Sequence, residues 1–248
     1  MKDFFNFIYM RNKGFIFVYN PKVACTNWKC ILRYLNGAED YLRPAVAHNR
    51  QESGLQFLSD DISAKSIVHD VNIPKYAFVR SPFSRILSAY LNKIEPYTEG
   101  RRDENDDNPY FHSVFCEIDK HRMDFLPEES SVNFYCFLHW LSNVDNFHTQ
   151  NEHWLPQVEL LRIPEVKYEF IGKLEALNKD APKLLGLIEC DIDFPSQQKV
   201  GFAPTNATDK LMQYYSSREI DVAKELYSID FEVLGYDTNL VINKAYVC

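Results

Sequence analysis

The sequence predicts an α/β fold in which a parallel sheet is flanked by helices. Three segments, 15–37, 76–94 and 168–189, each carry a short apolar strand followed by an amphipathic helix. Strands and helices that alternate in this way are typical of parallel sheets with helices on both faces. The 248 residues are 46% hydrophobic, and no repeat or low-complexity tract interrupts them. We therefore expect one domain over 1–248 with a substantial core.

The first of these segments is the most informative. Its strand is the apolar run 15–19, and its helix is indicated by apolar residues at i, i+3, i+4 and i+7. Those positions are Trp28, Ile31, Leu32 and Leu35. Thr26 and Asn27 are suitable types for the helix N-cap, and Gly37 is a plausible stop. The segment is thus predicted to run from strand through a tight loop to a helix.

The loop between them, 20–25, contains Lys22. The first turn of a helix leaves backbone N–H groups without partners, and its dipole makes that end positive. With the Lys22 ammonium and the Thr26 hydroxyl, the loop suits a phosphate or sulfate group. By itself it is also compatible with an ordinary strand–helix connection and a solvated lysine. It is not a Walker A loop, because G-x-x-x-x-G-K-[ST] is absent.

The second segment ends its strand, 76–79, at Arg80. Pro82 then stands at a position that helices favour for proline. Ser88 lies within the helix that follows. A guanidinium offers a bidentate fork to phosphate oxygens, and a helix hydroxyl can complete such a site. This strand end is therefore a second candidate anion site.

The stretch 21–29, PKVACTNWK, resembles the 5′-phosphosulfate loop of carbohydrate sulfotransferases of the chondroitin and dermatan 4-O type. These enzymes use 3′-phosphoadenosine-5′-phosphosulfate (PAPS). The stretch 80–93, RSPFSRILSAYLNK, resembles their 3′-phosphate motif, with Ser81 where the family usually has an acid. Supporting similarity extends in order to residue 236. The resemblance implies a P-loop-kinase-like sulfotransferase fold and a carbohydrate or polysaccharide acceptor.

The resemblance also implies the site residues. Lys22 is expected to neutralise charge on the leaving oxygen, while Arg80 and Ser88 are expected to hold the 3′-phosphate. A loop over 190–208 is expected to cover the nucleotide, with Lys199 and Thr205 as its nearest candidates. The expected cofactor-binding residues are Lys22, Val23, Ala24, Cys25, Thr26, Asn27, Arg80, Ser88 and Lys199.

The acceptor hydroxyl needs a base, and histidine is the usual choice near neutral pH. His48 lies between the two phosphate motifs, about where related glycan sulfotransferases have a histidine base. His153 belongs to an N-E-H-W segment that the family shares, and it is expected to line or to brace the acceptor site. His69 is a third candidate.

The remaining chain is predicted to be loop or lid over 95–112 and helical over 113–125 and 131–142. Ser216 and Glu219 are predicted to form a capping box.

Composition restricts the classes of function. The net charge of −8 gives no support to nucleic-acid binding. The six cysteines contain no C-x-x-C pair, which favours reduced thiols and argues against zinc. No metal is expected. No signal peptide or membrane span is visible, so we expect a cytoplasmic protein, or alternatively a soluble domain trimmed from a Golgi-lumenal enzyme.

Two other classes compete with a sulfotransferase. A nucleotide kinase would need a Walker A loop and a metal-binding acid, and neither is evident. A non-catalytic module that binds PAP, the desulfated nucleotide, or a glycan would keep Arg80 and Ser88 but would not need Lys22 or a base.

Overall fold

The computed structural model describes residues 3–102, 109–143, 151–201 and 203–240. They form two compact units. The sheet unit comprises Met1–Arg80 and Gln157–Pro204, and the helical unit comprises Ser81–Pro156 and Thr205–Cys248. The chain therefore leaves the sheet unit after Arg80 and returns to it at Gln157. The expectation of one domain over 1–248 stays a prediction.

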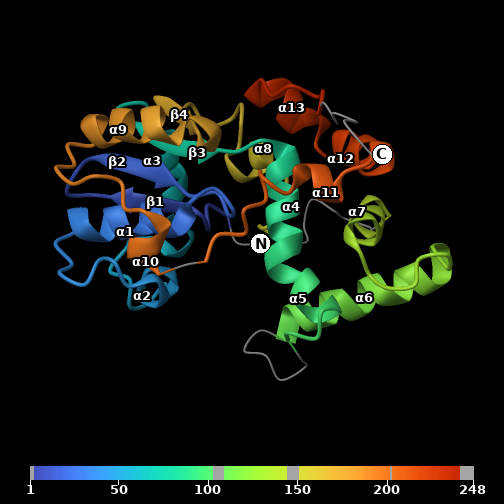
Figure 1. Cartoon of the computed structure of the whole chain (residues 1–248). Coiled ribbons are helices and arrows are strands. Elements are labelled where there is room, and N and C mark those ends of the chain that lie inside the picture. The colour runs from blue at the N-terminus through green and yellow to red at the C-terminus, as the bar shows by residue number, and fades with distance from the viewer. Residues whose placement is uncertain (1–2, 103–108, 144–150, 202, 241–248) are drawn as a thin grey trace. The chain divides into compact units, whose positions relative to one another are not determined.

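The sheet unit contains four strands, in the order β1-β2-β3-β4 (Figure 1). They are β1 (Phe7–Met10), β2 (Phe15–Val18), β3 (Lys75–Val79) and β4 (Phe170–Lys173). β2, β3 and β4 pair in parallel, which confirms the predicted α/β class. β1 was not predicted, and it pairs antiparallel with β2, so the sheet is mixed.

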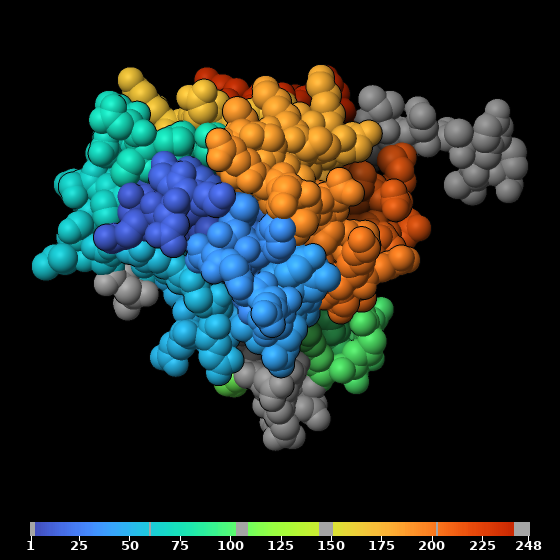
Figure 2. Space-filling view, turned by 90° about the vertical axis from the view of Figure 1, so that its left-hand side faces the viewer, coloured from blue at the N-terminus to red at the C-terminus, as the bar shows by residue number. Residues whose placement is uncertain are grey.

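The helices and 3₁₀ turns of the sheet unit lie between these strands or after β4. They are α1 (Cys25–Leu35), α2 (Pro44–His48), η1 (Leu58–Asp60), α3 (Ala64–His69), α8 (Gln157–Leu160), η3 (Leu174–Ala176), α9 (Leu177–Leu187) and α10 (Gln197–Val200). α9 lies beside β4, while α2 and α10 lie beside α1 (Figure 1). In Figure 2, amber and orange segments that include α9 and α10 border the blue segments of α1 and α2.

One face of the sheet packs against α1 and α9 in a single hydrophobic cluster. The Trp28 ring lies 5.2 Å from the Phe17 ring and 4.7 Å from the Phe78 ring. On the opposite face Val18 and Ala77 are also fully buried. Both faces are therefore covered, as the strand–helix alternation predicted.

The limits of α1 differ from the prediction at one end. The helix begins at Cys25 with Ala24 as its N-cap, so the expectation that Thr26 or Asn27 caps it is wrong. The Gly37 stop is confirmed, because Gly37 has φ 82° and its N–H donates to the Tyr34 carbonyl at 2.8 Å. A residue without a side chain adopts this left-handed conformation readily.

The helical unit has its own core. Its helices are α4 (Pro82–Lys93), α5 (Glu95–Thr98), α6 (Pro109–Phe125), α7 (Phe134–Ser142), α11 (Leu211–Tyr214), α12 (Ser217–Leu226) and α13 (Ser228–Leu234). The predicted helices over 113–125 and 131–142 are confirmed as α6 and α7. The loop predicted over 95–112 is wrong where α5 and the first turn of α6 lie, and its part 103–108 falls outside the described residues.

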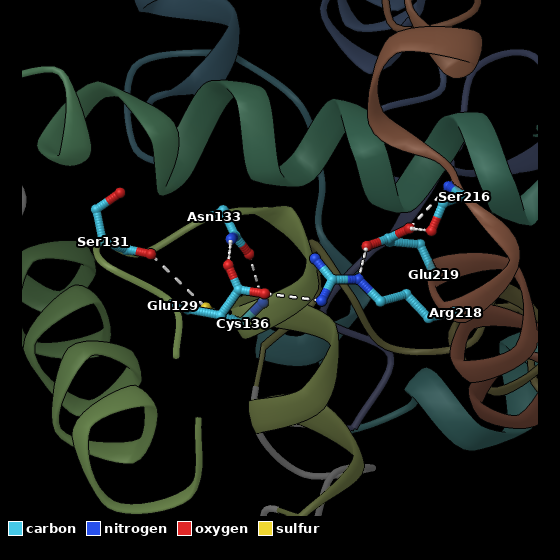
Figure 3. Close-up of polar contacts among 7 residues, drawn as sticks. All are labelled: Glu129, Ser131, Asn133, Cys136, Ser216, Arg218 and Glu219. Carbon is cyan, nitrogen blue, oxygen red and sulfur yellow. Dashed lines mark hydrogen bonds and ion pairs between the residues drawn. The ribbon is translucent and has the colours of Figure 1, made fainter. Parts of the chain in front are cut away.

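A chain of polar contacts joins α12 to the segment before α7 (Figure 3). The Ser216 N–H donates to Glu219 Oε2 at 2.7 Å, which confirms the predicted capping box. Arg218 bonds Glu219 at 2.8 Å and Glu129 at 2.7 Å. Asn133 Nδ2 then donates to Glu129 Oε2 at 2.6 Å. The start of α12 is thus fixed by charged groups of two segments.

Within the described ranges, no helix combines the length and the apolar character needed to cross a bilayer.

Candidate functional site

The loop after β2 has an unusual backbone. Lys22 and Ala24 both have positive φ, at 69° and 50°. Such conformations cost side-chain-bearing residues about 1–3 kcal/mol each and are concentrated at functional sites. Successive N–H groups in turns of this kind converge into anion-binding concavities. Ala24, the N-cap residue of α1, makes no side-chain hydrogen bond to the first turn, whose N–H groups are the type of donor that binds anions.

Two predicted residues meet beside this loop. Thr26 lies in the first turn of α1, and its Oγ1 is 2.8 Å from Nε2 of His48 at the end of α2. Thr26 is buried, whereas His48 is exposed. The packing of α2 against α1 therefore brings a solvent-accessible imidazole to the predicted phosphosulfate loop.

Arg80 follows β3, the parallel neighbour of β2. Its Nη1 donates to the Lys22 carbonyl at 3.1 Å, and the side chain is largely buried. Loops that follow neighbouring parallel strands meet outside the carboxyl edge of the sheet. The structure thus brings the predicted 5′ and 3′ phosphate residues of the sheet unit together.

Lys199 is exposed on α10. Val200 next to it packs against Cys30 of α1 and Ala47 of α2. Asn27 Nδ2 also donates to the Pro195 carbonyl at 2.9 Å. The segment predicted to cover the nucleotide is therefore attached to α1, although it contains the short helix α10 as well as loop.

Three predicted residues belong to the helical unit, and two of them are in contact. The hydroxyl oxygens of Ser88 on α4 and Thr205 lie 2.9 Å apart. Ser88 is buried and Thr205 is half-buried.

His153 is half-buried in the same unit. Its Nδ1 lies 2.7 Å from Asn151 Oδ1, and its ring packs edge-on against Phe111 at 5.5 Å. These contacts orient the ring, which is compatible with both roles expected for it.

His69 lies elsewhere in the sheet unit. It ends α3, shortly before the amino end of β3, and its Nε2 is 3.3 Å from Glu165. Lys22 and Arg80 follow the carboxyl ends of their strands, which is the opposite edge. Within the sheet unit, the structure therefore separates His69 from Lys22 and Arg80.

Two buried amides beside the site received no role from the sequence. Asn20 opens the loop that contains Lys22, and Gln157 begins α8. Gln157 is fully buried and hydrogen-bonds both Asn20 and Arg80. The feature of the sequence that could have pointed to Gln157 is the family-like segment 151–157, which ends at this residue.

No group of three or more His, Cys, Asp or Glu side chains within the described ranges is arranged to hold a metal ion. The five described cysteines are free thiols. Burial raises the pKa of the Cys30 thiol, on the inner side of α1, to about 11. The polar groups gathered around the loop are instead backbone N–H groups, a hydroxyl, an imidazole and two cations, which suit an anionic ligand.

A helix N-terminus that follows two residues with positive φ, with a lysine and a neighbouring arginine at the carboxyl edge of a parallel sheet, is an arrangement that suits phosphate or sulfate esters. The model of the sulfotransferase family matches residues 5–237. The chain belongs to this family, which confirms the family recognised from the motifs.

Among curated relatives, carbohydrate sulfotransferase 14 of Danio rerio is 32% identical over 236 residues, covering 90% of this chain and 59% of that protein. Carbohydrate sulfotransferase 11 of Rattus norvegicus is 29% identical over 238 residues, with 89% and 64% covered. Carbohydrate sulfotransferase 14 of Homo sapiens is 29% identical over 239 residues, with 93% and 60% covered. The chain spans about three fifths of the length of these relatives. No solved structure matches it.

Proposed function

We propose that the protein transfers a sulfuryl group from PAPS to a hydroxyl of a carbohydrate acceptor. The observation that carries the proposal is the backbone of the loop before α1. Lys22 and Ala24 in this loop have left-handed conformations, and the Arg80 side chain donates to the Lys22 carbonyl. The names of the relatives support a carbohydrate acceptor. The proposal treats 1–248 as one sulfotransferase domain, and a cytoplasmic location stays a prediction.

Bound PAPS would supply the sulfuryl group. Its ribose carries one phosphate at the 5′ position, next to the sulfuryl group, and one at the 3′ position. The N–H groups of 24–27 and the Thr26 hydroxyl would bind its 5′ end, whereas the Val23 N–H is already bonded to the Asn20 carbonyl. Arg80 and Ser88 would bind the 3′-phosphate, and Lys199 would contact the nucleotide from α10. Each charge-assisted hydrogen bond contributes about 1.5–3 kcal/mol.

Lys22 would neutralise the negative charge that develops on the bridging oxygen as its bond to sulfur breaks. Loss of one such preorganised donor lowers turnover by about 10²–10³. The in-line displacement resembles phosphoryl transfer, in which positioning and charge stabilisation supply most of the rate. Because these cations can neutralise the developing charge, we propose that the reaction needs no metal ion.

His48 would accept the proton of the acceptor hydroxyl as that oxygen bonds to sulfur. Its contact with Thr26 supports this role, since Thr26 belongs to the proposed sulfuryl-binding loop. A positioned base contributes about 10²–10⁴-fold. His153 is the second candidate, because it belongs to the family-like segment that precedes α8.

The test is transfer of labelled sulfate from PAPS to a panel of glycans, read by mass spectrometry, with and without a chelator. Lys22→Ala and His48→Ala should each lower turnover by at least about 10². Lys65→Ala and His69→Ala, which change residues on α3, are the matched controls and should leave turnover unchanged.

Thermal unfolding in the presence of nucleotides separates the competing classes. Stabilisation by PAP, but not by ATP with magnesium, is the expected result. Stabilisation by ATP with magnesium alone would indicate a kinase, and PAP binding without transfer to any glycan would indicate a binding module.

A further inference from the structure

The side chain of Gln157 bonds to both loops that carry the proposed site. It is 0% exposed. Its Nε2 donates to the Arg80 carbonyl at 2.8 Å, and its Oε1 accepts from the Arg80 N–H at 2.9 Å. The same Oε1 accepts from Asn20 Nδ2 at 2.9 Å. One amide group therefore holds the backbone of Arg80, directly after β3, and the side chain of Asn20, two residues after β2.

The orientation of these amides follows from the backbone groups that they meet. A carbonyl only accepts and an N–H only donates, so the two backbone groups of Arg80 fix which end of the Gln157 amide is nitrogen. Oε1 then faces Asn20 and requires a donor, which makes the nearer atom of Asn20 its Nδ2. Asn20 Oδ1 is left buried without a hydrogen-bond partner among the described residues.

Asn20 is also part of the loop itself. The Val23 N–H donates to the Asn20 carbonyl at 3.2 Å, which closes the turn that contains Lys22. Through Asn20, Gln157 is connected to the proposed 5′-phosphosulfate loop. Through Arg80 it is connected to the proposed 3′-phosphate residue. The Arg80 guanidinium adds its own bond to the Lys22 carbonyl at 3.1 Å.

We propose that Gln157 is a positioning residue that fixes the spacing between the two phosphate-binding loops; this inference rests on the proposed function. A ligand with a phosphate at each end is held well only if both loops have the right separation. A misplacement of about 1 Å at such a site costs up to 10²-fold. A ligand with only the 5′-phosphate does not require that separation.

The experiment compares binding of PAP with binding of adenosine 5′-phosphate, by calorimetric titration of the full chain. Gln157→Met keeps the approximate size of the side chain and removes its hydrogen bonds to Asn20 and Arg80. It should lower the affinity for PAP by about tenfold or more, and the affinity for adenosine 5′-phosphate much less. Gln51→Met, at an exposed position, is the matched control and should leave both affinities unchanged.

Gln157→Asn serves as a second variant, in case the methionine variant does not fold. It keeps an uncharged amide with the same donor and acceptor, but its side chain is one methylene shorter and reaches the two loops less well. Its ratio of PAP to adenosine 5′-phosphate affinity should lie between those of wild type and Gln157→Met. A purely structural role would instead lower the unfolding temperature and leave this ratio unchanged.

The outcomes separate the two proposals. If wild type binds PAP more tightly than adenosine 5′-phosphate and the folded Gln157 variants keep that preference, the positioning role is wrong while the proposed function stands. If wild type binds no PAP, the proposed function fails and the positioning role fails with it. Loss of the preference in the Gln157 variants supports both.

Discussion

Gly172 should not tolerate even one added methyl group. It lies in β4, paired with Phe78 of β3. A Cβ at Gly172 would stand 2.4, 2.6 and 2.8 Å from three atoms of the Phe78 ring, where ordinary contacts begin at 3.4 Å. The ring cannot move freely, because the Trp28 ring lies 4.7 Å from it and the Phe170 ring 6.2 Å. Gly172→Ala therefore requires a shift of buried aromatic groups.

Overpacking of this kind costs about 1–3 kcal/mol. For a chain of this size that is a decrease in Tm of roughly 2–12 °C. The assay is thermal unfolding followed by circular dichroism. Gly186→Ala is the matched control: Gly186 lies in α9 with nothing within 4 Å of an added Cβ, so alanine should stabilise the helix by about 0.5–1 kcal/mol.

Because Phe78 precedes Arg80 by two residues, Gly172→Ala should also weaken PAP binding. Combining it with Phe78→Leu should recover part of the lost stability, since the two side chains then no longer compete for one space. An unchanged Tm in Gly172→Ala would refute the reasoning, as would an equal decrease in Gly186→Ala.

Three further predictions concern other parts of the molecule. Ser216→Ala removes the cap of α12 and should cost about 0.5–2 kcal/mol in urea unfolding; an unchanged midpoint would contradict the capping role. Cys30, with its pKa raised by burial to about 11, should react with iodoacetamide at pH 8 far more slowly than exposed Cys116, as peptide mass spectrometry would show. Burial and the neighbouring His139 lower the pKa of His121 below its ordinary 6.5. The unfolded chain then binds its proton first, so stability should fall as pH falls through 6.5, and His121→Leu should reduce that fall in Tm; an unchanged pH dependence would contradict it.

Local sequence patterns were sufficient for much of this fold. The apolar run before Lys22 and the helical spacing after it depend on neighbours within one or two turns, and both are confirmed. β1 was missed because it is a four-residue strand whose pairing with β2 is set by a turn around Gly14 at φ 72°. α5 was missed because Glu95–Thr98 lies in a polar, proline-containing stretch that resembles loop.

The residues of the candidate site likewise differ in whether a local pattern reveals their role. Lys22 and Arg80 were predicted as ligands because each follows a strand in a recognisable motif. Gln157 could not be given its role, because its partners lie 77 and 137 residues away along the chain. The need for glycine at 172 likewise follows from its register with Phe78, which no local pattern reveals.

The central claim is that one nucleotide is held by the loop of Lys22 at its 5′ end and by Arg80 at its 3′ end. The most direct test is a crystal structure of the chain with PAP. We expect the 5′-phosphate against the N–H groups that begin α1 and the Lys22 ammonium, with the 3′-phosphate on the Arg80 guanidinium. Phosphates bound away from either group, or PAP bound at another surface, would contradict the account.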